Sequence, residues 1–247
     1  MNPRNSALPR PLAMELARTE YDRCLDLFRS LTESDWATPT DCPAWDVRQM
    51  GCHMLGMVEM AASVRENVRQ QRKASRAGGD PLDALTALQV AEREDWLPQR
   101  LVEVFAVRAP KAAIGRRRAP ALIRKRAMPG HQDVNGAREP WSFGYLVDVI
   151  LTRDPWMHRI DIAHATGRPL RVTEDHDGVI VADVVAEWAG RHGKDFDLTL
   201  TGPAGGKWQV GSDGPALTFD AVEFCRALAL RPAGIPSEDL MGTAIAF

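Results

Sequence analysis

Three residues of this 247-residue chain combine reactive side chains with a suggestive spacing: His53, Asp154 and His158. Asp154 and His158 lie four positions apart, so on a helix they share one face, within a stripe that is otherwise apolar. A carboxylate in such a stripe is costly to bury unless it is hydrogen-bonded, ion-paired or bound to a metal. His53 lies in a second amphipathic stretch. If the two stretches pack together, the three side chains predict a divalent-metal site with an open coordination position, which is typical of a reactive site.

A purely structural interpretation fits the same residues. Asp154 would be the N-cap of a helix that has Pro155 at its first position, with the carboxylate accepting from backbone N–H groups. His158 would then be a core histidine with a local partner, and His53 a structural residue on a helix face. Spacing alone leaves both interpretations open, because an Asp/His pair at this separation often arises by accident.

Three groups of segments follow one another along the chain in a recognisable order: residues 31–36, 39–48 and 53–56; residues 152–161 and 165–168; and residues 200–208 and 219–226. The first two groups resemble the N-terminal region and the second metal motif of the mycothiol-dependent maleylpyruvate isomerase family, part of the DinB-like group of metal-binding four-helix bundles. The third is similar to the small sterol-carrier-protein-like domain that follows the bundle in many members.

This resemblance implies an α+β protein of two domains. Residues 1–168 are expected to form the DinB-like four-helix bundle. Residues 169–247 are expected to form a small sterol-carrier-protein-like α+β domain that contains an antiparallel sheet. The resemblance also implies mycothiol as thiol cofactor or cosubstrate, beside a divalent metal held by His53, Asp154 and His158.

The donor set and the thiol together suggest a chemistry. Two imidazoles and one carboxylate suit zinc first among the divalent metals. A thiol bound to such a metal loses its proton, and the thiolate is the reactive nucleophile. In an isomerase the thiolate adds to a cis double bond, permits rotation and leaves, whereas in an S-transferase it stays on the electrophilic small molecule. The competing hypothesis is a non-catalytic module, either a metal-binding or a thiol-sensing scaffold.

Supporting roles fall to other charged residues. Arg226 and Arg231 are the candidate catalytic residues that clamp a substrate carboxylate, because a guanidinium binds a carboxylate in bidentate fashion. Ordinary surface arginines are the alternative. Asp161, nearly one turn beyond His158, is a candidate to orient an imidazole, or else it pairs with a neighbouring arginine.

Composition bounds the class of protein. The net charge of −2 gives no support for a nucleic-acid partner, and no apolar run approaches the roughly 20 residues of a membrane span. The four cysteines show no paired spacing, which fits a reducing compartment, and the polar N-terminus has no apolar signal region. A cytoplasmic protein is therefore expected, and its oligomeric state stays open.

Apolar periodicity and breaker residues predict the elements. Four long helices are expected over residues 11–31, 46–72, 82–107 and 142–165, followed by a helix over 179–191, strands over 196–201, 207–210 and 216–219, and a last helix over 220–230. Pro155 predicts a kink or bulge in the fourth helix, or the junction of two shorter helices.

The basic region from residue 108 to residue 138 has two interpretations. It is a solvated surface insertion, since runs of like charge usually decorate surfaces, or it is a lid for an anionic substrate or a partner-binding patch. It lacks the aromatic residues that single-stranded nucleic-acid binding requires.

Overall fold

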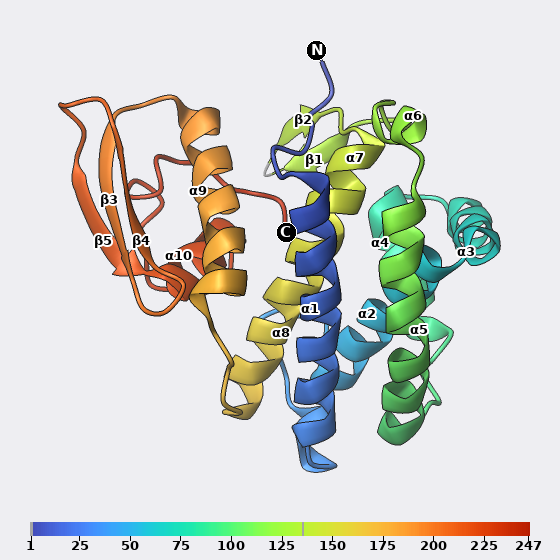
Figure 1. Ribbon diagram of the computed structural model, residues 1–247. Coiled ribbons are helices and arrows are strands. Elements are labelled where there is room, and N and C mark those ends of the chain that lie inside the picture. Colours follow the sequence, from blue (N-terminus) through green and yellow to red (C-terminus); the bar gives the residue numbers. More distant parts are fainter. Residues whose placement is uncertain (1, 135) are drawn as a thin grey trace. The chain divides into compact units, whose positions relative to one another are not determined.

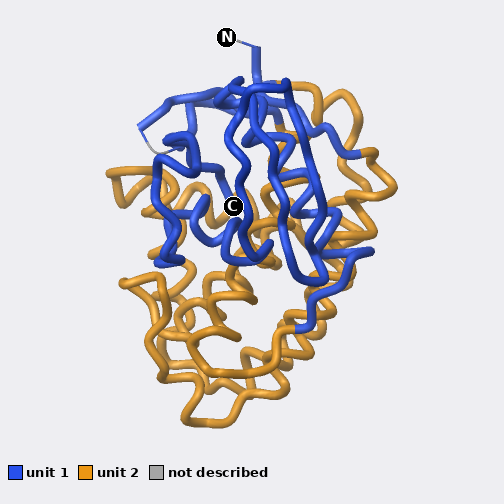
Figure 2. Tube along the Cα trace, turned by 90° about the vertical axis from the view of Figure 1, so that its left-hand side faces the viewer, with its two compact units in different colours: residues 1–8, 127–142, 171–247 blue, residues 9–126, 143–170 orange. Residues whose placement is uncertain are grey.

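The computed structural model describes residues 2–134 and 136–247, and its contacts divide the chain into two compact units (Figure 2). Unit 2 consists of residues 9–126 and 143–170, and unit 1 of residues 1–8, 127–142 and 171–247. The sequence places a single boundary after residue 168. In the structure the first eight residues and a segment inside the expected bundle group with the C-terminal unit, because chain packing need not follow chain order.

Unit 2 is helical. Its elements are α1 (Arg10–Ser30), the 3₁₀ turn η1 (Ser34–Ala37), α2 (Val47–Ala62), α3 (Val64–Ala77), α4 (Pro81–Ala91), α5 (Pro98–Arg118), α6 (Ala121–Arg124), α7 (Phe143–Tyr145), the π-helical turn η2 (Leu146–Ile150) and α8 (Leu151–Thr166). Helix α1 packs on α5 and α8, and α2 packs on the same two helices (Figure 1). This closed ring is a four-helix bundle, and aromatic and aliphatic side chains such as Phe28, Met50 and Phe105 fill its core.

Two of the expected helices are each divided in the structure. The helix predicted over 46–72 breaks at Ser63, whose backbone is extended and whose hydroxyl accepts from the Glu66 N–H at the start of α3. The helix predicted over 82–107 is interrupted between α4 and α5, and Leu97 and Pro98 begin the second part. The short helices α3 and α4 pack on one another and on α2, outside the ring of four.

A buried arginine compensates for the proline in α8. Pro155 has no N–H, so the Leu151 carbonyl has no helical donor. The Arg116 guanidinium donates to that carbonyl at 2.7 Å, to the Val147 carbonyl at 2.9 Å and to the Thr152 hydroxyl at 2.6 Å. The helix continues through Pro155, and the irregularity is the π-helical turn η2 that precedes α8. The expected bulge is therefore present, but upstream of the proline.

The first part of the basic region is not a surface insertion. Residues 108–118 form the end of α5, and Arg116 is 2% exposed because its guanidinium lies among carbonyls of the bundle. Arg117 and Arg118 are exposed, as expected for a charged helix end. A run of arginines in the sequence does not reveal which of them is buried, since only one residue in three or four of a helix faces inward.

Unit 1 is the α+β part of the chain. Its elements are β1 (Gln132–Val134), β2 (Ala137–Glu139), η3 (Glu174–Gly178), α9 (Val179–His192), β3 (Phe196–Thr201), β4 (Gly206–Val210), β5 (Ala216–Asp220) and α10 (Ala221–Leu228). The three-stranded sheet has the order β4-β3-β5, with β4 antiparallel and β5 parallel to the central β3. The predicted hairpin is present, but the sheet is mixed rather than antiparallel because β5 crosses to the far edge of β3.

The alternation predicted for β3 sets the core of unit 1. Phe196, Leu198 and Leu200 are buried, and the Phe196 ring lies 4.8 Å from the Trp188 ring of α9. Phe224 of α10 meets the same indole edge-to-face at 5.3 Å. Among the described residues, no helix has the combination of length and apolar character that crossing a bilayer requires.

Candidate metal centre

The structure brings together the three side chains that the sequence singles out. His53 comes from α2, and Asp154 and His158 from successive turns of α8. One carboxylate oxygen of Asp154, Oδ1, lies 3.4 Å from Nε2 of His53 and 3.4 Å from Nε2 of His158. The two imidazoles are 3% and 7% exposed. The N-cap interpretation of Asp154 does not hold, because the residue lies inside α8.

Local sequence explains how α2 presents His53. Asp46 and Gln49 form a capping box in which each side chain accepts from the other residue's backbone N–H, and this fixes the start of the helix. His53 follows about two turns later on the inward face, where Met50 and Met54 beside it are fully buried. The imidazole is thereby held on a rigid element of the bundle.

Each imidazole is also anchored at its second nitrogen. Nδ1 of His53 lies 2.8 Å from the amide oxygen of Gln89 on α4, and Nδ1 of His158 lies 3.4 Å from Oδ2 of Asp161. Both acceptors favour a proton on Nδ1, so Nε2 is the nitrogen of each ring that faces Asp154 and that would bind a metal. The orienting role of Asp161 stays a prediction, to which this geometry is suited, and Arg159 pairs with Glu20.

Electrostatics keep the centre charged in the metal-free protein. Burial alone raises the pKa of Asp154, but the neighbouring His158 and His53 outweigh it and hold this pKa well below its ordinary value. Burial likewise opposes protonation of His158, yet the Asp154 carboxylate raises its pKa well above the ordinary value. The centre therefore favours a carboxylate in contact with positive charge.

The second carboxylate oxygen of Asp154, Oδ2, indicates that the centre binds a ligand. Oδ2 is buried and has no hydrogen-bond partner among the described residues. A buried carboxylate oxygen without a partner is costly. The candidate ligand atoms of His53, Asp154 and His158 all lie within 4.8 Å of one another, so a single cation can meet all three. Two imidazole nitrogens and a carboxylate fit zinc.

The loop before α2 adds two residues that sequence reasoning left without a role. The Trp45 ring lies 4.9 Å from the His53 ring and 5.8 Å from the His158 ring. The Cys42 thiol donates to Oδ2 of Asp161 at 3.8 Å, and Cys42, Asp161 and His158 make up a second group with metal-binding side chains. Their position just before the helix that carries His53 is the signal that identifies them.

Cys52, the neighbour of His53, is a core residue as expected. It is 1% exposed, and burial raises the pKa of its thiol to about 11, so the thiol stays protonated.

Arg226 and Arg231 belong to unit 1, whereas the three candidate ligands belong to unit 2. Arg226 is 2% exposed, and its guanidinium donates to the Glu223 carboxylate at 2.9 and 3.0 Å. Arg231 donates to the Ala229 carbonyl at 3.2 Å. These contacts give Arg226 a structural role within unit 1, and the clamp stays a prediction for both arginines.

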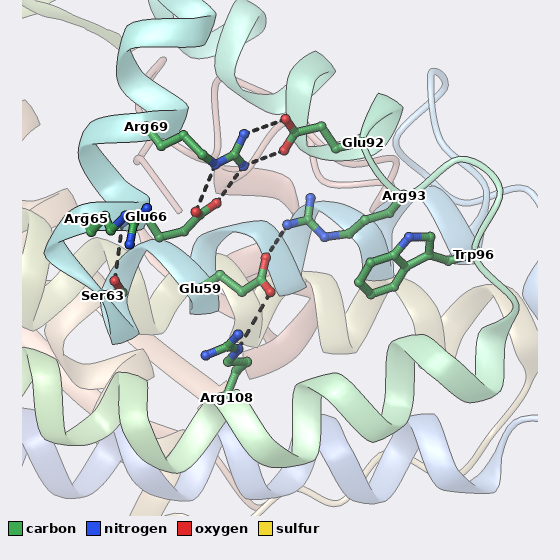
Figure 3. A pocket seen from close by; sticks show the side chains of 9 residues that line it. All are labelled: Glu59, Ser63, Arg65, Glu66, Arg69, Glu92, Arg93, Trp96 and Arg108. Carbon is green, nitrogen blue, oxygen red and sulfur yellow. Dashed lines mark hydrogen bonds and ion pairs between the residues drawn. The ribbon is translucent and has the colours of Figure 1, made fainter.

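A separate pocket of about 700 Å³ lies in unit 2 at the end of α2, beside α3 and α5 (Figure 3). Its charged side chains largely neutralise one another. Arg69 bridges Glu66 and Glu92, with its closest N···O distance to each at 2.6 Å, and Arg93 pairs with Glu59. The sequence gives no sign of this pocket, since its residues come from three separate segments of the chain.

The chain is similar to proteins of one known family. The model of the mycothiol maleylpyruvate isomerase N-terminal domain matches residues 17–163. Two solved structures are similar to this chain: the crystal structure of the mycothiol-dependent maleylpyruvate isomerase and that of a histidine-to-alanine mutant of it. Each has a TM-score of 0.57 and 13% sequence identity, and the match covers 89% of this chain and 88% of the other. No curated protein matches the chain. The structural likeness supports the α+β fold that the sequence predicts.

Proposed function

Since this chain belongs to the mycothiol maleylpyruvate isomerase family, as its motifs indicate, we propose that it is a metal-dependent enzyme that uses a small thiol, mycothiol, on an electrophilic small molecule. The reaction is isomerisation of an activated double bond or S-transfer to the electrophile. The observation that carries the proposal is the Asp154 carboxylate, with one oxygen between two imidazoles and the other buried without a hydrogen-bond partner among the residues that the structure describes.

His53, Asp154 and His158 would hold the divalent metal, with zinc as the first choice. When bound, the metal supplies a Lewis acid that lowers the pKa of a thiol, and the thiol supplies a nucleophilic sulfur for reversible addition to a conjugated double bond. Gln89 and Asp161 fix the two imidazoles, so that their Nε2 atoms point to one place. The Trp45 ring packs beside both imidazole rings and would help to exclude water from them.

A clamp for the substrate belongs to the same proposal. Arg226, whose guanidinium also donates to Glu223, and Arg231 are the candidates for binding a substrate carboxylate.

The test combines metal content with thiol-dependent turnover. Purified wild-type protein should contain a divalent metal, and His53→Ala, Asp154→Ala and His158→Ala should each lose it. His164→Ala is the matched control, since this histidine lies on the same helix with its side chain 57% exposed and paired with Asp41.

Turnover of a panel of electrophiles, with and without added thiol, separates the alternatives. Turnover only when metal and thiol are both present supports the enzyme. Metal without thiol-dependent turnover favours the non-catalytic metal-binding or thiol-sensing scaffold. Wild-type protein that binds no divalent metal would refute the proposal.

A further inference from the structure

Two buried glutamines connect the candidate metal centre to the outer helix pair. Gln89 on α4 and Gln70 on α3 are both 0% exposed. The Gln89 amide oxygen meets Nδ1 of His53 at 2.8 Å, and its NH₂ group donates to the Gln70 amide oxygen at 3.0 Å. The Gln70 NH₂ group donates to Oε1 of Glu66 at 2.9 Å and to the Gly56 carbonyl at 3.3 Å. Together Gln89 and Gln70 form what we call the amide chain.

The acceptors at its outer end fix the direction of the amide chain. A carboxylate and a backbone carbonyl only accept hydrogen bonds, so Gln70 must turn its NH₂ group towards Glu66 and Gly56. Its oxygen then faces Gln89, which turns its own NH₂ group outward and its oxygen towards His53. The His53 ring nitrogen that meets this oxygen must carry a proton. The orientation of two buried amides thus selects the Nδ1–H form of His53 and leaves Nε2 for Asp154.

Glu66 is held as a pure acceptor by the neighbouring pocket (Figure 3). Arg69 donates to its two oxygens at 2.6 and 2.9 Å, and this hydrogen bonding lowers the pKa of the Glu66 carboxyl. Glu92 holds the same guanidinium from the other side at 2.6 and 2.7 Å. A carboxylate that stays ionised cannot reverse the amide chain by donating a proton.

The sequence makes room for the amide chain with a glycine. A Cβ at Gly56 would lie 2.4 Å from Cγ of Gln89, which is far inside contact distance. The sulfurs of Met57 and Met60 approach the Gln89 NH₂ group at 3.3 Å each. Gly56 is three residues after His53 on α2, so the space for the glutamine lies beside the histidine it orients.

We infer that Gln89 and Gln70 are positioning residues that set the proton of His53 on Nδ1 and direct its Nε2 to the metal. This inference rests on the proposed metal centre. Gln70 does not contact His53 in any hydrogen bond that the structure describes, yet it acts on the histidine by holding the Gln89 amide in one orientation. In Gln70→Leu the Gln89 NH₂ group keeps only the Met57 and Met60 sulfurs, which are weak acceptors, so the amide can turn this group to Nδ1 and oppose the required proton.

The experiment measures zinc affinity of the full-length protein by competition with a chelator. Gln89→Leu and Gln70→Leu should each weaken zinc binding about 10–100-fold, the range typical of losing a partner of a metal-bound histidine. Leu85→Ala is the matched control, because it removes packing from the same α2–α3–α4 layer without removing a hydrogen-bonding group. Its zinc affinity should stay within about twofold of wild type.

A double variant tests the direction of the amide chain. The two oxygens of a carboxylate are equivalent, so glutamate at position 89 accepts from His53 in either orientation. Gln70→Leu combined with Gln89→Glu should therefore recover most of the zinc affinity that Gln70→Leu loses. In the zinc-loaded protein, the Nδ1–H resonance of His53 should be present in wild type and in the double variant, and lost or rapidly exchanging in Gln70→Leu.

The outcomes distinguish two failures. Wild type without zinc binding refutes the metal centre itself. Wild type that binds zinc while folded Gln70→Leu binds it equally well, with the same Nδ1–H resonance, refutes the amide chain and leaves the metal centre standing. If Gln70→Leu does not fold, the nearly isosteric Gln70→Met replaces it, and unchanged zinc affinity in that variant refutes the inference equally.

Discussion

Arg116 should contribute more to the stability of unit 2 than any ordinary arginine of a basic run. In Arg116→Met the aliphatic stem keeps much of its packing, and the guanidinium donors are lost. The Leu151 carbonyl then loses the donor that replaces the missing Pro155 N–H, and the Val147 carbonyl loses one as well. A buried acceptor without a partner costs about 1–3 kcal/mol. With the Leu151 carbonyl counted fully and the Val147 carbonyl in part, Arg116→Met should destabilise the protein by about 3 kcal/mol.

Urea unfolding followed by circular dichroism measures this free energy. Arg118→Met is the control, since Arg118 is exposed on the same helix and should change stability by less than about 0.5 kcal/mol. In a Pro155→Ala background, residue 155 regains the N–H that pairs with the Leu151 carbonyl, so Arg116→Met should cost about 1 kcal/mol less there. An Arg116→Met cost close to that of Arg118→Met, or an equal cost in both backgrounds, would show that the guanidinium does not replace the missing helical bond.

Three further predictions concern the centre, the pocket and the clamp. Gly56→Ala should destabilise the protein by about 1–3 kcal/mol and weaken zinc binding, as chelator competition would show, because its new methyl displaces Gln89. Hydrogen bonding from Arg69 lowers the pKa of Glu92 from its ordinary 4.5 to about 2. The ionised Glu92 therefore stabilises the fold fully above pH 4.5, and this stabilisation is lost as the pH falls towards 2. Acid titrations of stability should therefore show Glu92→Gln approaching wild type between pH 4.5 and 2, by a modest amount because the pair is partly exposed. Arg231→Ala should raise KM for a carboxylate substrate while metal content stays unchanged, and an unchanged KM in steady-state assays would remove Arg231 as the clamp.

The divided helices show where reasoning from periodicity ends. The apolar pattern continues through Ser63, so a single helix over 46–72 fits it equally well. At the break, the Ser63 backbone is extended and the Ser63 hydroxyl caps α3. This arrangement competes with a continuous helix because α3 then packs against α4. The parallel pairing of β5 has the same origin, because strand pattern predicts which face is buried and not which neighbour a strand takes.

The basic run shows a limit of a different kind. Three consecutive arginines look alike in sequence, yet Arg116 is buried and the next two are exposed. The need for an internal donor arises at Pro155, nearly forty positions later, and only the packing of α5 beside α8 brings the guanidinium to it.

The sequence by itself determined the local features of this protein: the helix faces that hold His53, Asp154 and His158, the start of the helix at Asp46, the β3 alternation and the family to which the chain belongs. These depend on the spacing of neighbouring residues and on short motifs, which the chain carries wherever its elements come to lie. Only the tertiary structure decided that Gln89 would meet the second nitrogen of His53, and that one oxygen of Asp154 would find no partner within residues 2–134 and 136–247. A buried polar atom must find its partner across helices that are distant in sequence, and packing alone decides which partner lies within hydrogen-bond distance.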